Sequence, residues 1–486
     1  MLQKDLNTNK EFGFVLSAQD YLLFLTGLPT IKINDIILTQ KGSRALVTGL
    51  ENEKVEALML DSERPKPGDM FAKSTAGLYI PNITHLLGRA ISPLGAPLDD
   101  KGSLPPGGSL LDIDKTASGI DTREIIAKQF ITGITLIDTL LPIGRGQREL
   151  LFGESRSGKS SFILDTIINQ KGQKTICIYT AIGRSDVDVQ RFIKSINENG
   201  AFDYTVLIAA TSSEAAPLIY IAPAVGFAIA ENFRDKGLDV LLILDDLGNH
   251  AKYLREIGLL SGRIPGRESY PPDIFYEHSH LVERAGNFNE NLGKGSITLL
   301  PVVETDIEKF TNLIPTNVMS MTDGHLLFSS SLRAHGSYPA IDPDRSVTRV
   351  GRQTQPFLHK IVADRVRSLL ANFHELERYS RFGSELTPQS QLTIKRGNIV
   401  VELLRQEPLE KIDSQVQILL LGLLFSSFFD NWEIEPVRIN RRKIIDILGT
   451  DNEFKRTIAD MRRMNFDALV GRLKENHKII EDGLKQ

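Results

Sequence analysis

A glycine-rich stretch between a strand-like segment and a helix-like segment constrains this chain more than any other feature. Residues 149–153 (ELLFG) have the composition of a buried strand, and residues 160–170 (SSFILDTIINQ) have the pattern of a helix. The motif Gly-x4-Gly-Lys-Ser, which starts at Gly153, has the spacing of a loop that wraps phosphate groups. The N-terminus of the following helix is aimed at the same anion. The residues expected to bind phosphate are Gly153, Glu154, Ser155, Arg156, Ser157, Gly158, Lys159 and Ser160.

The loop and a nearby acidic strand end together predict a magnesium-nucleotide site. Within the loop, Lys159 would pair with the outer phosphates, and Ser160 would place its hydroxyl on a magnesium ion. Residues 240–246 (VLLILDD) predict a buried strand that ends in two carboxylates. A carboxylate in this position can bind magnesium, usually through water. We expect Asp245 to have this role, and Asp246 is the second candidate. The simpler alternative is that the carboxylate caps the next segment.

The hydrophobic pattern divides the 486 residues into three predicted domains. Residues 1–76 contain short β-prone runs broken by turn residues, which predicts an antiparallel β-barrel. In residues 77–355 strands alternate with helices, which predicts a central α/β domain of the P-loop NTPase (RecA-like) class with a mostly parallel sheet. Residues 356–486 become helical and predict an α-helical bundle, with an apolar stripe along residues 358–379.

Individual elements follow from the same pattern. Helices are expected over residues 189–200 and 215–237, and residues 91–108, rich in Pro and Gly, are expected to form a long loop. The further strands expected in the central domain are residues 174–182, 205–211, 240–246, 296–304 and 317–322.

Composition excludes several classes of protein. A single cysteine, Cys177, lies in an apolar run, which excludes a disulfide framework and fits a reducing compartment. The net charge of −4 does not favour nucleic acid as a partner. The longest apolar run, residues 418–429, is shorter than the ~20 residues of a membrane-spanning helix and predicts a buried helix. The first residues do not fit a secretory signal.

Binding a nucleotide and hydrolysing it are separate abilities. Hydrolysis needs a residue that orients or activates the attacking water. We expect such a carboxylate just after the strand at 174–182, where the sequence continues with Arg184 and contains no glutamate. Asp186 and Asp188 are nearby but shorter. The residues alone therefore show no glutamate at this position and leave the ability to hydrolyse nucleotide open.

Longer motifs resemble the α subunits of F-type ATP synthases. The resemblance covers residues 12–400 well and the rest loosely. The motifs that carry it are residues 142–161 (PIGRGQRELLFGESRSGKSS), 210–237 (ATSSEAAPLIYIAPAVGFAIAENFRDKG), 265–286 (PGRESYPPDIFYEHSHLVERAG), 314–324 (IPTNVMSMTDG) and 339–351 (PAIDPDRSVTRVG).

The resemblance implies a non-catalytic, regulatory subunit that binds ATP or ADP with Mg²⁺. Its implied partners are a catalytic β subunit in an alternating α3β3 ring, a γ shaft, a peripheral-stalk δ subunit and, indirectly, a membrane sector. Such a complex couples ATP synthesis or hydrolysis to transmembrane flow of protons or sodium ions. The chain would then be a peripheral protein on the cytoplasmic side of the cell membrane.

The resemblance also assigns roles to residues outside the loop. In the motif SVTRVG, Arg349 would reach across the subunit interface to the neighbour's γ-phosphate, and Ser346 would help to set the interface geometry. An arginine suits this task because its planar, always-charged guanidinium stabilises charge on phosphoryl oxygens. Gln406 would lie at the adenine side of the nucleotide site. There the chain departs from the family, since residues 333–339 read RAHGSYP.

Four alternative functions remain open from the sequence. One is an α-like subunit of a specialised F-type-related ATPase. A flagellar or secretion export-type hexameric ATPase would keep the catalytic glutamate. An RNA translocase would carry a basic or aromatic platform in its N-terminal domain. A scaffold that binds no nucleotide would have no need of the phosphate loop.

Overall fold

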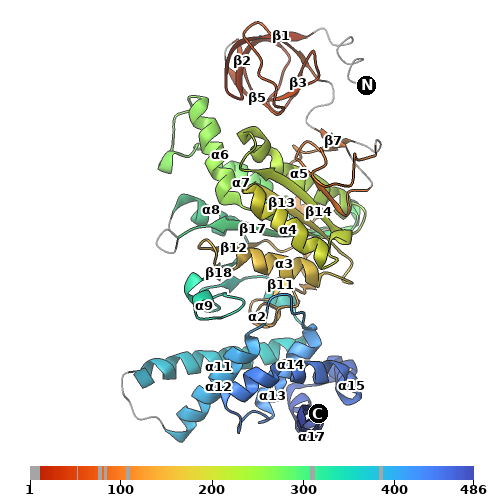
Figure 1. Ribbon diagram of the computed structural model, residues 1–486, viewed down its shortest axis with the longest axis vertical. Helices are drawn as coiled ribbons and strands as arrows, with labels where there is room; N and C mark the ends of the chain where they lie inside the picture. The colour runs from red at the N-terminus through yellow and green to blue at the C-terminus, as the bar shows by residue number, and fades with distance from the viewer. Residues whose placement is uncertain are drawn as a thin grey trace. The chain divides into compact units, whose positions relative to one another are not determined.

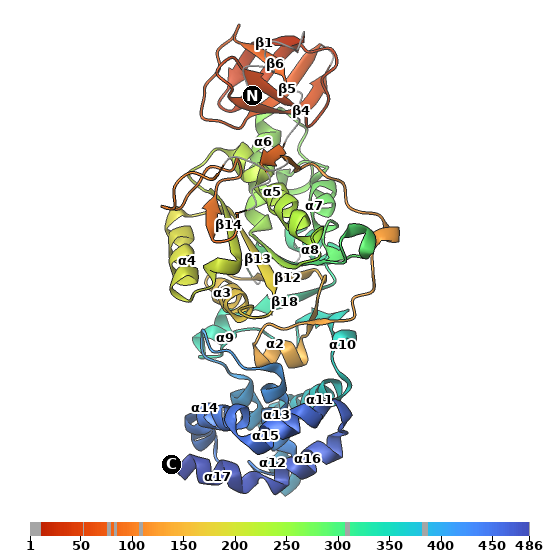
Figure 2. The same cartoon turned by 90° about the vertical axis from the view of Figure 1, so that its right-hand side faces the viewer.

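The computed structural model of this chain describes most of the sequence (Figures 1 and 2). The described residues are 11–51, 53–74, 79–81, 85–105, 110–306, 312–381 and 387–485. Contacts divide the chain into two compact units. Unit 1 comprises Met1–Ile125, Gly146–Ser155 and Lys171–His325, and unit 2 comprises Ile126–Arg145, Arg156–Gln170 and Leu326–Gln486.

The N-terminal part of unit 1 is a closed antiparallel barrel, as the sequence predicts. Its strands, in spatial order, are β1 (Phe12–Gln19), β2 (Leu22–Gly27), β5 (Lys54–Met59), β4 (Arg44–Glu51), β3 (Ile36–Thr39) and β6 (Met70–Lys73). Leu23, Val47 and Phe71 are fully buried in its interior. Closure removes the unpaired edges that a small open sheet would expose.

The rest of unit 1 is built on a parallel sheet with helices packed against it. The parallel strands of this sheet in unit 1, in spatial order, are β12 (Glu149–Gly153), β17 (Ser296–Glu304), β15 (Asp239–Asp245), β13 (Thr175–Arg184), β14 (Thr205–Thr211) and β8 (Arg89–Ile91). The helices that contact these strands include α4 (Asp186–Glu198), α5 (Ala216–Arg234) and α6 (Leu247–Leu260). β14 is buried along its whole length, as expected for a parallel strand covered on both faces.

Helix α5 is the one described helix that is long and apolar enough to cross a membrane by length and composition alone. In the structure 72% of this segment is buried inside the protein. The core helix of a soluble protein passes the same test, so this property is weak evidence for a membrane span.

One predicted strand is wrong. Residues 317–321 belong to helix α8 (Leu313–Met321), Thr322 is its C-cap, and the next strand is β18 (Gly324–Phe328). A short apolar run does not distinguish a strand from a buried helical turn by periodicity alone. Pro315 lies in the first turn of α8, where a missing N–H costs nothing, and this position was the available sign of a helix. The predicted loop at 91–108 follows β8 with turns through residue 105; residues 106–108 lie outside the described part of the chain.

Unit 2 contains the helix after the phosphate loop and the C-terminal helices. The helix after the loop is α3 (Lys159–Asn169), and α2 (Thr135–Leu140) precedes it in the chain. The C-terminal helices, which gather in the blue part of Figure 2, are α11 (Phe357–Arg381), α12 (Pro388–Leu404), α13 (Ser414–Phe425), α14 (Ile434–Thr450), α15 (Asn452–Asp460), α16 (Phe466–Glu475) and α17 (His477–Lys485). This confirms the predicted helical region.

Two details of the C-terminal helices differ from the simplest expectation. The predicted buried helix at 418–429 is α13, which is almost wholly buried but ends at Phe425. The apolar stripe of α11 buries Val362, Val366 and Phe373, whereas its Leu369 stays half-buried. The stripe therefore marks the buried face of α11, as amphipathic periodicity predicts.

Candidate functional site

The phosphate-loop residues follow the predicted strand and begin the predicted helix. β12 ends at Gly153, and α3 begins at Lys159 after the N-cap residue Gly158. Gly153 and Gly158 have φ of 146° and 108°, a backbone conformation that a side chain would strain. Arg156 has φ of 58°, so the chain makes its turn with one non-glycine residue in the left-handed region. This local geometry is the reason for glycine at both motif positions.

The carboxyl ends of the strands in unit 1 bring Asp245 to the same sheet edge as the start of the loop. Gly153 pairs with Glu304 across β12 and β17, and Asp245 pairs with Ala181 across β15 and β13. Asp245 is 2% exposed, and the Tyr179 hydroxyl donates a hydrogen bond of 2.7 Å to its Oδ2. A buried carboxylate at this edge is the type of ligand that Mg²⁺ takes, since Mg²⁺ binds one or two carboxylates together with substrate phosphates.

Arg184 lies at the end of β13 among these carboxylates. Its Nη1 is 3.4 Å from Oε2 of Glu304 and 3.9 Å from Oδ1 of Asp245. Although burial opposes its charge, the nearby carboxylate of Asp245 raises the pKa of Arg184. The position at which a catalytic chain would need a water-activating glutamate therefore holds a permanent cation beside two carboxylates.

The two aspartates that follow Arg184 belong to the start of α4. Ser185 is the N-cap of this helix, and its hydroxyl donates a hydrogen bond of 2.8 Å to Asp188. Asp186 accepts a hydrogen bond of 3.3 Å from Ser213. Acidic side chains in a first helical turn are stabilised by the helix dipole, so a structural role accounts for both.

Asp246 has the capping role that was the simpler alternative for this acidic pair. It is the N-cap of α6, and its side chain accepts a hydrogen bond from the Asn249 backbone N–H. Burial, and then the charge of Asp245, raise the pKa of Asp246 to about 7. The two adjacent aspartates thus differ in environment, which leaves Asp245 as the candidate for the metal. Among the described residues, no group of three or more His, Cys, Asp or Glu side chains is placed to hold a metal by itself.

Gln406 lies in unit 2 and is 1% exposed. Its Oε1 accepts from the backbone N–H and the hydroxyl of Thr135 at 2.9 and 3.1 Å. Its Nε2 donates to the carbonyl oxygens of Gly133 and Glu410, both at 2.7 Å. An amide has two donor hydrogens and two acceptor lone pairs, so these bonds use its capacity. The hydrogen bonds of this amide are therefore made within the chain, and the structure does not test the predicted place of Gln406 at the adenine side.

The loop after Gln406 is tied to α3. The Leu409 backbone N–H donates a hydrogen bond of 3.0 Å to Asp165 of α3, and the Tyr338 hydroxyl donates to the other carboxylate oxygen. Burial raises the pKa of Asp165. Asp165 is not among the residues predicted from the sequence. Its position among the apolar residues of α3 is the sequence feature that could have indicated a buried carboxylate with a fixed partner.

Ser346 is buried and holds the segment before Arg349. Its hydroxyl donates to the Asp342 carbonyl oxygen at 2.6 Å and accepts from the Leu327 backbone N–H at 3.0 Å. Ser346 is 8% exposed, and its hydroxyl both donates and accepts a hydrogen bond. These two bonds stabilise the backbone conformation at the start of the motif. They join Ser346 to Asp342 and to Leu327 of β18.

Thr348 and Gly351 hold the backbone on either side of Arg349. The Thr348 hydroxyl donates to the Pro142 carbonyl oxygen at 2.8 Å and accepts from the Gly351 N–H at 3.2 Å. A Cβ at Gly351 would lie 1.5 Å from the Pro142 oxygen, so the two segments meet at closer range than any side chain allows. Between these anchors Arg349 is exposed, and no hydrogen bond or ion pair joins it to another described residue. Its guanidinium is available to another molecule.

Comparison with known proteins identifies related sequences. Residues 133–348 match the model of the nucleotide-binding domain of the ATP synthase alpha/beta family, and residues 355–477 match the model of the C-terminal domain of the ATP synthase alpha/beta chain. The chain is 40% identical to the ATP synthase subunit alpha of Acholeplasma laidlawii, over 97% of this chain and 96% of the relative. It is 38% identical to the ATP synthase subunit alpha of Lacticaseibacillus casei, over 91% of this chain and 87% of the relative.

Proposed function

This chain belongs to the ATP synthase alpha/beta family and matches its α subunits along nearly its whole length, and we propose that it is the non-catalytic, nucleotide-binding subunit of a rotary ATPase. As a member of this family it is part of an ATPase complex and carries a nucleotide-binding domain. The finer proposal concerns the division of labour within that complex. This chain holds nucleotide, and its partner hydrolyses or makes it.

The observation that carries this proposal is Arg184. A guanidinium placed between Glu304 and Asp245 accepts no proton from water and so does not act as a general base. The nearest alternatives, Asp186 and Asp188, are engaged at the start of α4. Without a water-activating group, a bound nucleotide stays intact.

We assign nucleotide binding to the phosphate loop. Its backbone N–H groups and Lys159 would hold the phosphates of ATP or ADP, with Ser160 and Asp245 as the residues toward Mg²⁺. When bound, Mg²⁺ supplies positive charge that offsets the phosphate charge. The environment of Asp245, buried and oriented by Tyr179, supports this assignment. We also propose domain limits of 1–76, 77–355 and 356–486 for the barrel, the nucleotide-binding domain and the helical domain.

Arg349 is proposed to serve the partner. The hydroxyls of Ser346 and Thr348 hold the backbone segment that carries Arg349. Its exposed guanidinium would enter the nucleotide site of a catalytic β subunit in an α3β3 ring and stabilise charge on the γ-phosphate. The names of the relatives support partners of the ATP synthase type, among which we include β, the γ shaft and a δ subunit. The complex would lie on the cytoplasmic side of the cell membrane and couple to proton or sodium flow through a membrane sector.

The experiment that tests this function compares binding with turnover. The purified full chain is titrated with Mg-ATP by calorimetry, and ATP hydrolysis is measured on the same sample. The proposal expects binding at one site and no turnover above the level of a Lys159→Ala variant. Turnover by the chain alone, abolished by Lys159→Ala, would show that the chain is itself a catalytic subunit.

A further inference from the structure

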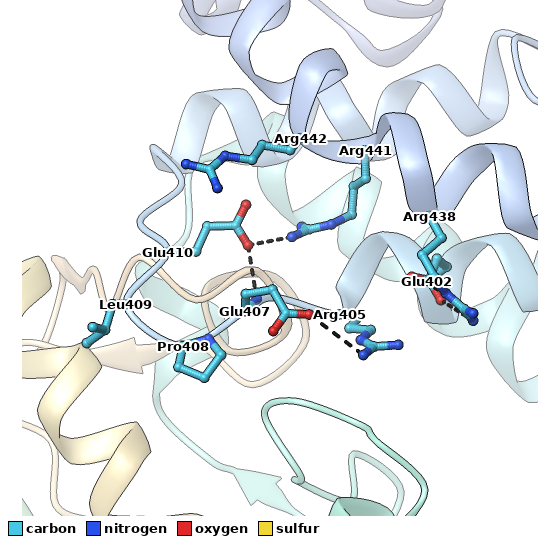
Figure 3. A pocket seen from close by; sticks show the side chains of 9 residues that line it. All are labelled: Glu402, Arg405, Glu407, Pro408, Leu409, Glu410, Arg438, Arg441 and Arg442. Atoms are coloured by element: carbon cyan, nitrogen blue, oxygen red, sulfur yellow. Dashed lines mark hydrogen bonds and ion pairs between the residues drawn. The ribbon is translucent and has the colours of Figure 1, made fainter.

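A cavity in the C-terminal part of unit 2 combines four arginines with three glutamates (Figure 3). It has a volume of about 420 Å³, within the range of small-ligand sites. The residues that line it are Glu402, Arg405, Glu407, Pro408, Leu409, Glu410, Arg438, Arg441 and Arg442. No residue of the phosphate loop lines this cavity. We propose that it binds a small phosphate-class anion with two or more negative charges, such as pyrophosphate.

Two of the arginines form the fixed walls of the cavity. Arg438 donates two hydrogen bonds of 3.2 Å to Glu402, one to each carboxylate oxygen. One terminal nitrogen of Arg441 donates a hydrogen bond to the Glu410 carboxylate. The same carboxylate accepts a hydrogen bond of 3.0 Å from the Glu407 backbone N–H. Arg441 is 7% exposed, and its other terminal nitrogen is buried with no hydrogen-bond partner among the described residues. The carboxylates of Glu402 and Glu410 are therefore committed to the walls.

The other two arginines are available to a ligand. Arg405, which follows α12, forms an ion pair with Glu407 at 3.7 Å, too long for a hydrogen bond. Arg442 projects from α14 beside Arg441, as Figure 3 shows, and neither a hydrogen bond nor an ion pair joins its side chain to the rest of the described chain. The cavity thus offers unused guanidinium donors from two different elements, a loop end and a helix.

The chemistry of these donors selects the ligand. A guanidinium presents its N–H groups in a planar fork that matches the oxygen atoms of phosphate. Arginines exceed glutamates by one in the lining, so the net charge of the lining favours an anion. An anion with two or more charges would engage Arg405 and Arg442 together, whereas a single charge would gain little over water. The phosphate groups can come from a free diphosphate or from a nucleotide.

The test is a calorimetric titration of the full chain with pyrophosphate in the absence of magnesium. All measurements use the Lys159→Ala background, so that binding to the phosphate loop does not obscure the cavity. One site is expected to persist in this background. The double variant Arg405→Gln/Arg442→Gln should weaken it at least about tenfold, since each change removes a charge-assisted contact. A parallel titration with ADP distinguishes the source: competition with pyrophosphate assigns the site to nucleotide phosphates, and no competition assigns it to a free diphosphate.

Two further variants test whether the effect is specific to the cavity: one should leave pyrophosphate affinity unchanged, and the other should increase it. Arg462→Gln/Arg463→Gln removes the same charge from exposed positions outside the cavity and should leave affinity within about twofold. Glu407→Gln releases Arg405 and should tighten binding about two- to fivefold. Circular dichroism checks that the variants are folded. The proposal is overturned if pyrophosphate binding disappears with Lys159→Ala alone, or if the cavity and control variants weaken it equally.

Discussion

The substitution Thr348→Val tests how this chain holds Arg349. Valine has nearly the shape of threonine but lacks the hydroxyl, so the change removes two hydrogen bonds and little packing. The Thr348 hydroxyl donates to Pro142 and accepts from Gly351, at 2.8 and 3.2 Å. Arg349 lies between Thr348 and Gly351 in the sequence. Loss of these bonds releases the backbone on both sides of its guanidinium.

The size of the effect follows from the groups left without partners. An ordinary hydrogen bond contributes about 0.5–1.5 kcal/mol to stability, and a buried group left unsatisfied costs about 1–3 kcal/mol. Thr348 and Pro142 are partly buried together, so we expect a loss of about 1–3 kcal/mol in the free energy of unfolding. Gly351 remains in close contact with the Pro142 oxygen, which limits how far the segment can move. A local change is therefore expected, not unfolding.

Urea denaturation followed by circular dichroism measures this loss. Thr450→Val is the matched control, because the Thr450 hydroxyl donates to the Asp446 carbonyl oxygen at 2.7 Å on an exposed helix surface. The control should cost less than about 0.5 kcal/mol. In complex with the catalytic partner, Thr348→Val should lower turnover while Mg-ATP affinity of this chain stays unchanged. Equal stability losses for both variants would refute the view that Thr348 anchors the motif.

The remaining predictions concern the nucleotide site and the buried histidines. Lys159→Ala should reduce Mg-ATP affinity of this chain at least about tenfold in a calorimetric titration, because a charge-assisted contact to phosphate is lost; unchanged affinity would exclude the phosphate-loop assignment. Arg184→Gln should lower the free energy of unfolding by about 1–3 kcal/mol in urea, since it leaves the buried Asp245 without its cation; a neutral result would mean that Arg184 does not stabilise this carboxylate. His250 of α6 and His278 of α7 (Ile274–Val282) are both buried. Burial lowers the pKa of His250 to about 4 and that of His278 to about 3, so their contribution to stability is present above about pH 6.5 and is lost as pH falls toward 4. Urea unfolding should therefore show lower stability at pH 5.5 than at pH 7.5, with a shallower change in His278→Asn; an identical pH dependence in that variant would contradict this.

Local sequence signals predicted much of the fold because they act over a few residues. Gly153 and Gly158 mark backbone positions that other residues do not adopt easily, and the apolar runs on either side form β12 and α3 as expected. The acidic end of β15 could also be predicted, because a run of five apolar residues, 240–244, directly before two aspartates has few alternatives. The error at residues 317–322 arose where a short run had no periodicity to decide between strand and helix.

Contacts between distant residues could not be predicted in the same way. Gln406 bonds to Thr135, 271 positions away, and no pattern near either residue indicates that pairing. The choice between Asp245 and Asp246 depended on which side chain caps α6, a matter of one residue in register. The hydrogen bond from the Thr348 hydroxyl to Pro142 joins residues 206 positions apart, and nothing in the SVTRVG motif indicates that partner.

The most direct test of the central claim is steady-state ATP hydrolysis by the complex of this chain with its catalytic β partner, with wild-type or Arg349→Ala chain. Arg191→Ala, an exposed arginine of α4, is the control, and Mg-ATP affinity is measured on the isolated chain. The proposal predicts that Arg349→Ala lowers turnover by roughly a thousandfold, as loss of an arginine finger does, with affinity of this chain's own site unchanged. Turnover equal to that of the control, or an equal loss of binding at this chain's own site, would contradict the claim that Arg349 acts across the interface.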